Sequence, residues 1–211
     1  MRALDVVVLA VTLLASSASA APVIDWENGR ILETGTGLAD RQAPNPAVAR
    51  GPAKRKAEDA ARRALRAAVE TLPLAGGGTV KDKLADAAIA GRMDRAIEAA
   101  LTVSATPETD GAWVVTLALP TEAVRQAIEG ARALPTDGDK APAVIVVEGA
   151  AAATPAIGTT IGGASVPIVW VTKVPAWAAK APRIKARSAK AGAIDADTKS
   201  ATPSTLFVVV N

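Results

Sequence analysis

Alanine makes up much of the apolar content of this chain, and this restricts the folds that it can adopt. Half of the 211 residues are hydrophobic, yet about 50 are alanine and only 2% are aromatic. An alanine side chain removes little apolar surface from water, so the fewer Val, Ile, Leu and Trp residues must supply most of the core. We therefore expect one or two small domains rather than a large multi-layered core.

The chain contains no histidine and no cysteine, which excludes most catalytic and metal-binding chemistry. A Ser-His-Asp triad, a cysteine nucleophile, a CxxC redox pair and the usual zinc and haem ligand sets all need one of these residues. Carboxylates remain, but the acidic pairs Asp25 with Glu27 and Glu58 with Asp59 are only neighbours in sequence. We expect no enzyme activity, no cofactor and no metal, with a carboxylate-based hydrolase as the remaining enzymatic alternative.

Residues 1–20 have the layout of a secretory signal peptide. A basic start at Arg2 precedes an apolar run over 6–14, and Ala18-Ser19-Ala20 forms a small-residue cleavage motif. That run is too short to anchor the chain, and no later stretch holds the roughly 18 apolar residues of a membrane helix. We expect cleavage before Ala21, no transmembrane span afterwards, and a product in the periplasm or at the outer-membrane periphery of a Gram-negative bacterium.

The first unit of the mature chain is expected over 21–134, followed by a polar linker over 135–142. It should begin with a strand over 31–36, in which Gly35 and Gly37 suggest a bulge or a close backbone approach. These glycines begin like a dinucleotide-binding motif, but the helix that should receive a phosphate arrives about ten residues late. We therefore expect a glycine-kinked strand.

A long amphipathic helix should follow this strand. Asn45-Pro46 suits a helix start, but Gly51-Pro52 is expected to break or kink the pattern, so the helix is expected over 53–72. One face is apolar and rich in alanine, at Ala57, Ala61, Leu65, Ala68 and Leu72. The other face is basic and is either solvated or a contact for an anionic partner, with the i,i+4 pairs Glu58 with Arg62 and Asp59 with Arg63.

A second helix is expected over 80–98, where Thr79 and Asp82 have the spacing of a capping box and Gly91 can interrupt the helix. The glycine run over 76–78 precedes it. This run lacks the spacing of a phosphate-binding loop, and no strong strand leads into it, so we expect a turn between the helices.

Alternating residues predict an antiparallel hairpin over 101–106 and 112–119 around an Asp110-Gly111 turn, followed by a short helix over 121–133. On the first strand Leu101, Val103 and Ala105 alternate with polar residues, and on the second Trp113, Val115, Leu117 and Leu119 form one apolar face. We expect an α+β fold of strand–helix–strand–strand type, with the Trp113 face packed under the alanine-rich helix.

A second, small β-rich unit is expected over 143–211, with strands near 143–147, 167–174, 183–186 and 206–210. Its supply of core residues is thin, so we expect it to pack on the first unit or on a neighbouring molecule. Trp170 lies in a β-forming run and should be buried. Trp177 follows a proline between alanines and is the better candidate for exposure.

A basic loop is the candidate binding site in this unit. Between 173 and 199 there are seven Lys and Arg residues and two Asp residues. It is either a mobile, solvated loop or a contact for an anionic partner, formed by Lys173, Lys180, Arg183, Lys185, Arg187, Lys190 and Trp177. A nucleic acid is not the expected partner of an exported chain, despite a pI of about 9.4.

Several stretches follow, in order, the pattern of one known family. They lie at 24–29, 34–37, 45–65, 80–82, 101–105 and 110–117, and then at 143–147, 155–157, 184–186 and 208–210. On these residues the chain resembles the FlgP-like family of bacterial envelope proteins, which are usually outer-membrane lipoproteins associated with flagellar motility. It departs from that pattern in lacking the lipid-bearing Cys, in having Gly51-Pro52 where the family keeps an unbroken helix, and in the Ala, Thr and Lys content of 150–205.

The resemblance implies a non-enzymatic protein that builds ring-like or disk-like assemblies around the flagellar motor. Our leading hypothesis is therefore an envelope protein that self-associates or docks on a larger assembly, with a link to the flagellum. The alternative is a periplasmic binding module that takes an anionic glycan or lipid through its basic loop. Rising ionic strength would weaken ligand binding through the basic loop more steeply than it would weaken an assembly held by apolar faces.

Overall fold

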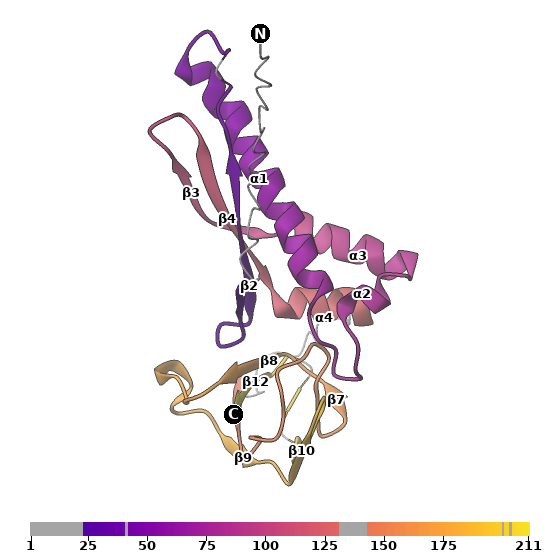
Figure 1. Cartoon of the computed structure of the whole chain (residues 1–211). Helices are drawn as coiled ribbons and strands as arrows, with labels where there is room; N and C mark the ends of the chain where they lie inside the picture. The colour runs from indigo at the N-terminus through magenta and orange to yellow at the C-terminus, as the bar shows by residue number, and fades with distance from the viewer. Residues whose placement is uncertain (1–22, 41, 131–142, 200, 203) are drawn as a thin grey trace, which may run out of the picture.

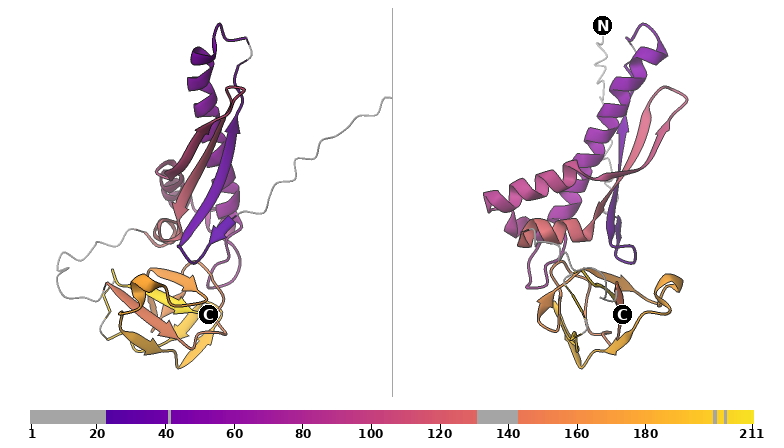
Figure 2. Two further views of the ribbon diagram at one scale, coloured as in Figure 1. Left: turned by 90° about the vertical axis from the view of Figure 1, so that its left-hand side faces the viewer. Right: turned by 180° about the vertical axis from the view of Figure 1, so that it is seen from behind.

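The computed structural model describes residues 23–211 apart from 41, 131–142, 200 and 203. The predicted signal peptide and the predicted linker therefore lie outside the described residues. The chain forms an elongated helical lobe over 23–130 and a smaller β lobe over 143–211 (Figures 1 and 2). The predicted α+β fold is confirmed: a long helix packs on an antiparallel sheet, and further small sheets follow in the C-terminal part.

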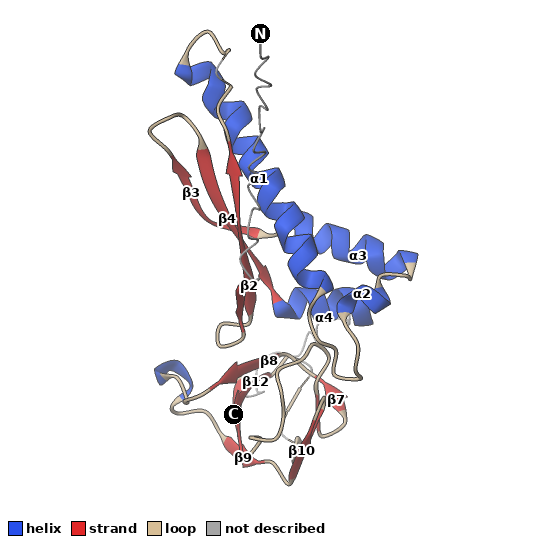
Figure 3. Ribbon diagram, viewed as in Figure 1, coloured by secondary structure: helices blue, strands red, loops and turns tan. Residues whose placement is uncertain are grey.

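The sheet of the helical lobe has four antiparallel strands in the order β1-β2-β4-β3. Their bounds are β1 Val23–Asp25, β2 Arg30–Gly37, β3 Leu101–Pro107 and β4 Trp113–Pro120. One face lies against α1, Pro46–Glu70, and buries Ile31, Val115, Leu117 and Leu119. Figure 3 shows this helix running along the sheet. The predicted packing of the hairpin under the alanine-rich helix is thus confirmed.

Two glycines of β2 allow α1 to approach the sheet at backbone distance. A Cβ at Gly35 would lie 2.2 Å from the carbonyl oxygen of Ala57, and one at Gly37 would lie 1.9 Å from that of Ala53. Real Cβ atoms are not found this close to other atoms, so only glycine fits at these positions. The predicted close backbone approach is confirmed, and it explains why alanine suits this face of the helix.

The helix α1 begins earlier than predicted, and Gly51-Pro52 does not break it. Asn45 caps the helix by accepting a hydrogen bond from the Val48 nitrogen at 3.0 Å, and the helix runs unbroken to Glu70. Proline lacks the N–H that would bond to the carbonyl four residues back. Pro52 lies on the exposed side of the helix, where water can satisfy that carbonyl, while the packed side continues through the buried Ala49 and Ala53.

The predicted second helix is two helices, α2 Val80–Lys83 and α3 Ala87–Glu98. The break falls at 84–86 and not at Gly91, because Asp86 caps α3 by accepting hydrogen bonds from two backbone nitrogens of its first turn. The predicted capping contact at the start of α2 is confirmed, since the Thr79 nitrogen donates to the Asp82 carboxylate at 2.7 Å.

The short helix α4 spans Thr121–Glu129 and is preceded by Pro120 as its N-cap. Thr121 is its first residue and does not cap it; the hydroxyl donates to the Gly29 carbonyl oxygen instead. Val124 on its apolar side is buried. The predicted continuation to 133 lies mostly outside the described residues.

The β lobe contains two four-stranded sheets. The first is all parallel, in the order β8-β12-β5-β9, with β5 Val144–Glu148, β8 Ile168–Val171, β9 Arg183–Lys185 and β12 Leu206–Val210. The second has the order β10-β11-β6-β7, with β6 Thr160–Ile161, β7 Ala164–Ser165, β10 Ser188–Lys190 and β11 Ala193–Asp195. A single 3₁₀ turn, η1, spans Ala176–Ala178 among the described residues.

The β lobe has a core of its own, contrary to the expectation of a thin one. Six large side chains are fully buried within it, contributed by both sheets: Ile145, Val147, Ile161, Ile194, Phe207 and Val209. The sequence shows only part of this core, because Ile161 and Ile194 lie in strands of two and three residues that are too short to recognise. The two lobes also touch, since the Trp170 nitrogen donates to the Trp26 carbonyl oxygen at 3.0 Å.

Candidate interaction surfaces

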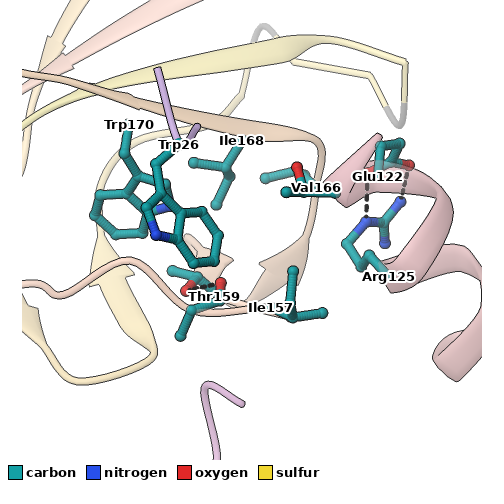
Figure 4. A pocket seen from close by; sticks show the side chains of 11 residues that line it. Trp26, Glu122, Arg125, Ile157, Thr159, Val166, Ile168 and Trp170 are labelled. Carbon is teal, nitrogen blue, oxygen red and sulfur yellow. Dashed lines mark hydrogen bonds and ion pairs between the residues drawn. The ribbon is translucent and has the colours of Figure 1, made fainter. Parts of the chain in front are cut away.

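The contact between the lobes encloses a first candidate site, and side chains nearly fill it. Trp26 and Trp170 lie on one side of this cavity, and Arg125 with Glu122 lies on the other (Figure 4). The space left is about 20 Å³, which is room for about one water molecule. This junction is therefore a packed contact between the lobes and is too small for a metabolite.

Arg125 of α4 joins the lobes through a cluster of charged hydrogen bonds. Its guanidinium donates to both carboxylate oxygens of Glu122, at 2.6 and 2.8 Å, and to Glu129 at 2.6 Å. It also donates to the hydroxyl of Ser165 in the β lobe at 3.0 Å. The hydrogen bond to Glu122 is the main reason that the pKa of Arg125 is raised above its ordinary value. The cluster is thus a structural clamp.

The neighbouring carboxylates Asp25 and Glu27 are each used in a structural contact. Asp25 accepts hydrogen bonds from Asn28 and, at 2.9 Å, from Arg30. Burial alone would raise the pKa of Asp25, but these bonds outweigh it and bring the pKa below its ordinary value of 3.8. Glu27 accepts a hydrogen bond from the Thr172 hydroxyl of the β lobe at 3.1 Å.

The basic face of α1 is paired with acidic residues, though not with the ones predicted. The ion pairs are Lys54 with Glu58 at 3.9 Å, Arg62 with Asp59 at 3.5 Å, and Arg66 with Asp94 of α3. The predicted pairs of Glu58 with Arg62 and of Asp59 with Arg63 do not form in the described structure. Residues three and four apart on a helix can both form ion pairs, so the sequence does not show which pairs form. The contact of Arg66 with α3 is tertiary and is not visible in the sequence.

Metal binding and membrane crossing find no support in the part of the chain that the structure describes. No three acidic, histidine or cysteine side chains of those residues come together as a metal site. None of the described helices combines the length and the apolarity needed to cross a bilayer.

All six cations of the predicted basic loop are exposed, and they follow one continuous stretch of the β lobe. That stretch is not a loop throughout, because it contains η1, β9 and β10. Arg183 pairs with Glu148 of the adjacent strand β5 at 2.7 Å. Among the described residues, ion pairs within 4.0 Å do not form at the other five, which are Lys173, Lys180, Lys185, Arg187 and Lys190.

The two tryptophans near this stretch lie as predicted. Trp170 in β8 is 4% exposed and belongs to the core of the β lobe, whereas Trp177 in η1 is 59% exposed. Trp177 therefore stands among exposed cations with most of its indole in contact with water.

The strand β3 forms a second exposed surface. The strand was predicted, and its apolar residues Leu101 and Val103 are 63% and 54% exposed. A register shift between Thr102 and Ser104 interrupts the pairing with β4, so the simple alternation does not hold. Since β3 is the last strand of its sheet, one side of its backbone has no neighbouring strand in the described structure.

Sequence reasoning missed the Arg125 cluster and the β3 edge for different reasons. The spacing of Glu122, Arg125 and Glu129 on one helix is visible in the sequence and could have identified the cluster. The position of β3 at the edge depends on strand order, and local alternation carries no information about it.

The fold and these surfaces define a two-lobed α+β protein with an exposed strand edge on one lobe and an exposed basic surface on the other. None of the protein-family models compared with the chain matches it, and a search of curated proteins finds no match either. The resemblance to the FlgP-like family therefore stays a prediction.

Proposed function

We propose that this chain is an exported, non-enzymatic protein of the bacterial envelope, with a structural role that it performs by self-association or by docking on a larger assembly. The observation that supports this proposal best is the exposed edge strand β3. A strand edge presents backbone N–H and C=O groups that another strand can pair with.

Natural proteins usually protect such edges with charged side chains, bulges or covering segments. The other edges here are charged, short or covered: β1 carries Asp25, β9 carries Arg183 and Lys185, β10 carries Lys190, and β7 has only two residues. At β8 the nitrogen of Trp170 donates to the other lobe. In contrast, β3 is seven residues long and exposes a leucine and a valine, and its protection is limited to a bulge and the terminal Pro107, with no charged side chain.

The uncharged composition of β3 favours a second strand as its partner. Two copies of the segment can pair without like charges facing each other, and its threonine and valine residues suit a sheet. The bulge shortens the regular edge but leaves 104–107 in register with β4. The location in the envelope and the association with the flagellum belong to the same proposal and rest on the leader-like 1–20 segment and on the family resemblance.

The test is to place a charge on the edge and measure the mass of the assembly. Val103→Lys should weaken self-association about tenfold or more, because a buried lysine would lack a partner in the paired sheet. Val48→Lys is a matched control, since Val48 of α1 is also a valine and is also 54% exposed. Light scattering over a range of concentrations, on protein purified after export, gives the dissociation constants.

A wild-type protein that stays monomeric with and without added envelope fraction would refute the proposal, as would equal self-association of the Val103 and Val48 variants. The flagellar part is tested separately. Deleting the gene in a flagellated host should reduce spreading in soft agar, and normal spreading would remove that part alone.

A further inference from the structure

The parallel sheet of the β lobe has a second apolar cluster on its outer face, which is buried at its centre and partly exposed at its margin. Parallel sheets are normally covered on both faces. One face of this sheet builds the lobe core, while the outer face carries Val146, Val169, Val171 and Val208. Within the described chain, Ala178 of η1 packs on these valines, and the turn at Gly29 reaches Val169 at one edge.

Several hydrophobic side chains around this cluster remain partly exposed. They are Val144, Val174, Ala181, Leu206 and Val210. Trp177 sits in the same 3₁₀ turn as Ala178 but points its side chain to water rather than onto the valines. We call this set, together with Trp177, the η1 surface.

The segment that carries the η1 surface is basic. From Lys173 to Lys190 the sequence contains six cations and no carboxylate. All six are exposed, and Glu148 pairs with Arg183 alone of them. Asp195 of β11 lies opposite Ser188 of β10, so acidic residues approach the far end of this segment, whereas Lys173 and Lys180 flank η1 in sequence. The surface therefore combines an exposed indole, partly exposed valines and two exposed lysines that form no ion pair among the described residues.

We propose that the η1 surface binds the surface of an anionic phospholipid bilayer. Indole rings prefer the headgroup region of a membrane, and lysines near it are attracted to anionic headgroups. Four of the six cations are lysine, which is depleted at protein interfaces. The lysine ammonium is a point charge on a flexible stem, so it can bind an anion without a fixed geometry. A fluid layer of phosphates suits such side chains better than a fixed protein or glycan surface does.

This inference is independent of the self-association proposed above, because β3 and the η1 surface belong to different lobes. It gives a chain without a lipid-bearing cysteine a means of holding to a membrane. The apolar side chains would enter the interface while the lysines remain at the level of the phosphates.

Co-sedimentation with vesicles tests the proposal. Protein purified after export should bind vesicles of phosphatidylcholine with phosphatidylglycerol, bind those of phosphatidylcholine alone far less, and bind more weakly as salt rises. Each lysine near an anionic surface contributes about fivefold to partitioning, so the Lys173→Gln/Lys180→Gln variant should bind roughly 25-fold more weakly. Trp177→Ala should reduce binding about tenfold and should abolish the blue shift of tryptophan emission on vesicles.

The matched control is Lys81→Gln/Lys83→Gln, which removes two exposed lysines from α2 and should bind like the wild type. Val103→Lys should also retain binding, which separates this inference from the proposal about β3. Circular dichroism confirms that each variant is folded. Equal binding by the Lys173/Lys180 variant and its control would overturn the proposal. So would equal binding to neutral vesicles, or tighter binding to soluble polyglutamate than to anionic vesicles, which would indicate an acidic protein partner.

Discussion

Replacing Gly37 by alanine tests the close contact between α1 and β2. Gly37 pairs with Trp113 of β4, on the face of the sheet that carries the helix. The added Cβ would lie 1.9 Å from the carbonyl oxygen of Ala53 and 2.5 Å from the nitrogen of Ala57, whereas ordinary contacts begin at 3.4 Å. Both obstacles are helix backbone, so no side-chain rotation can relieve the overlap.

Helix α1 and strand β2 must therefore move apart. The free energy of unfolding falls because packing contacts between them are lost. The overlap with the carbonyl oxygen is about 1.5 Å, and a gap of even about 1 Å removes up to half of the dispersion energy of each facing atom pair. Overpacked cores lose about 1–3 kcal/mol. Because backbone atoms block the site, we expect Gly37→Ala to cost about 3 kcal/mol, which lowers the Tm by about 6–12 °C in a chain of this size.

Urea and thermal unfolding followed by far-UV circular dichroism measure this loss. Gly76→Ala is the matched control, because Gly76 lies in the loop between α1 and α2 with nothing within 4 Å of the added Cβ and with no positive φ. That variant should be unchanged or more stable by up to about 1 kcal/mol. A Gly37 variant within about 0.5 kcal/mol of the wild type would refute the reasoning about the close contact.

Two further predictions concern charge. Burial on the helix-facing side of β2 raises the pKa of Glu33 above its ordinary value of 4.5. The ionised Glu33 carboxyl therefore lowers the stability of the fold above the raised pKa, and this cost disappears as the pH falls below 4.5. In urea unfolding, Glu33→Gln should stabilise the protein by about 0.5 kcal/mol at pH 7 and should have no effect at about pH 3.5. A destabilised variant at pH 7 would contradict this sign. Arg125→Ala leaves Glu122 and Glu129 without their cation, and because all three are partly solvated we expect a loss of about 2 kcal/mol in the same assay. A loss under about 0.5 kcal/mol would mean that the clamp contributes little.

Local patterns predicted the helical lobe well where the contacts that decide it are local. The glycines of β2, the cap at Asn45 and the inward face of β4 each depend on a few neighbouring residues, and the structure confirms them. The helix through Gly51-Pro52 was mispredicted because propensity disfavours it, while the buried Ala49 and Ala53 and the close approach of Ala53 to Gly37 of β2 favour it.

Other parts of the structure depend on contacts that the sequence does not display. The strands β6 and β7 have two residues each, too few for any alternation to be recognised. The exposure of Leu101 and Val103 follows from a register shift and from the place of β3 at the edge. For the basic surface, the sequence identified the cations and Trp177, but not the partly exposed valines of the same sheet face, because the parallel pairing that creates this face joins strands distant in sequence.

Trp26 contributes to the packing of both lobes. Its side chain packs against the buried residues of both cores, and its carbonyl oxygen accepts a hydrogen bond from Trp170. Unfolding of either lobe would expose the Trp26 indole to water on one side and weaken its packing against the core of the other lobe. Together with the hydrogen bonds of Arg125 with Ser165 and of Thr172 with Glu27, this shared ring should make the two lobes unfold as one cooperative unit.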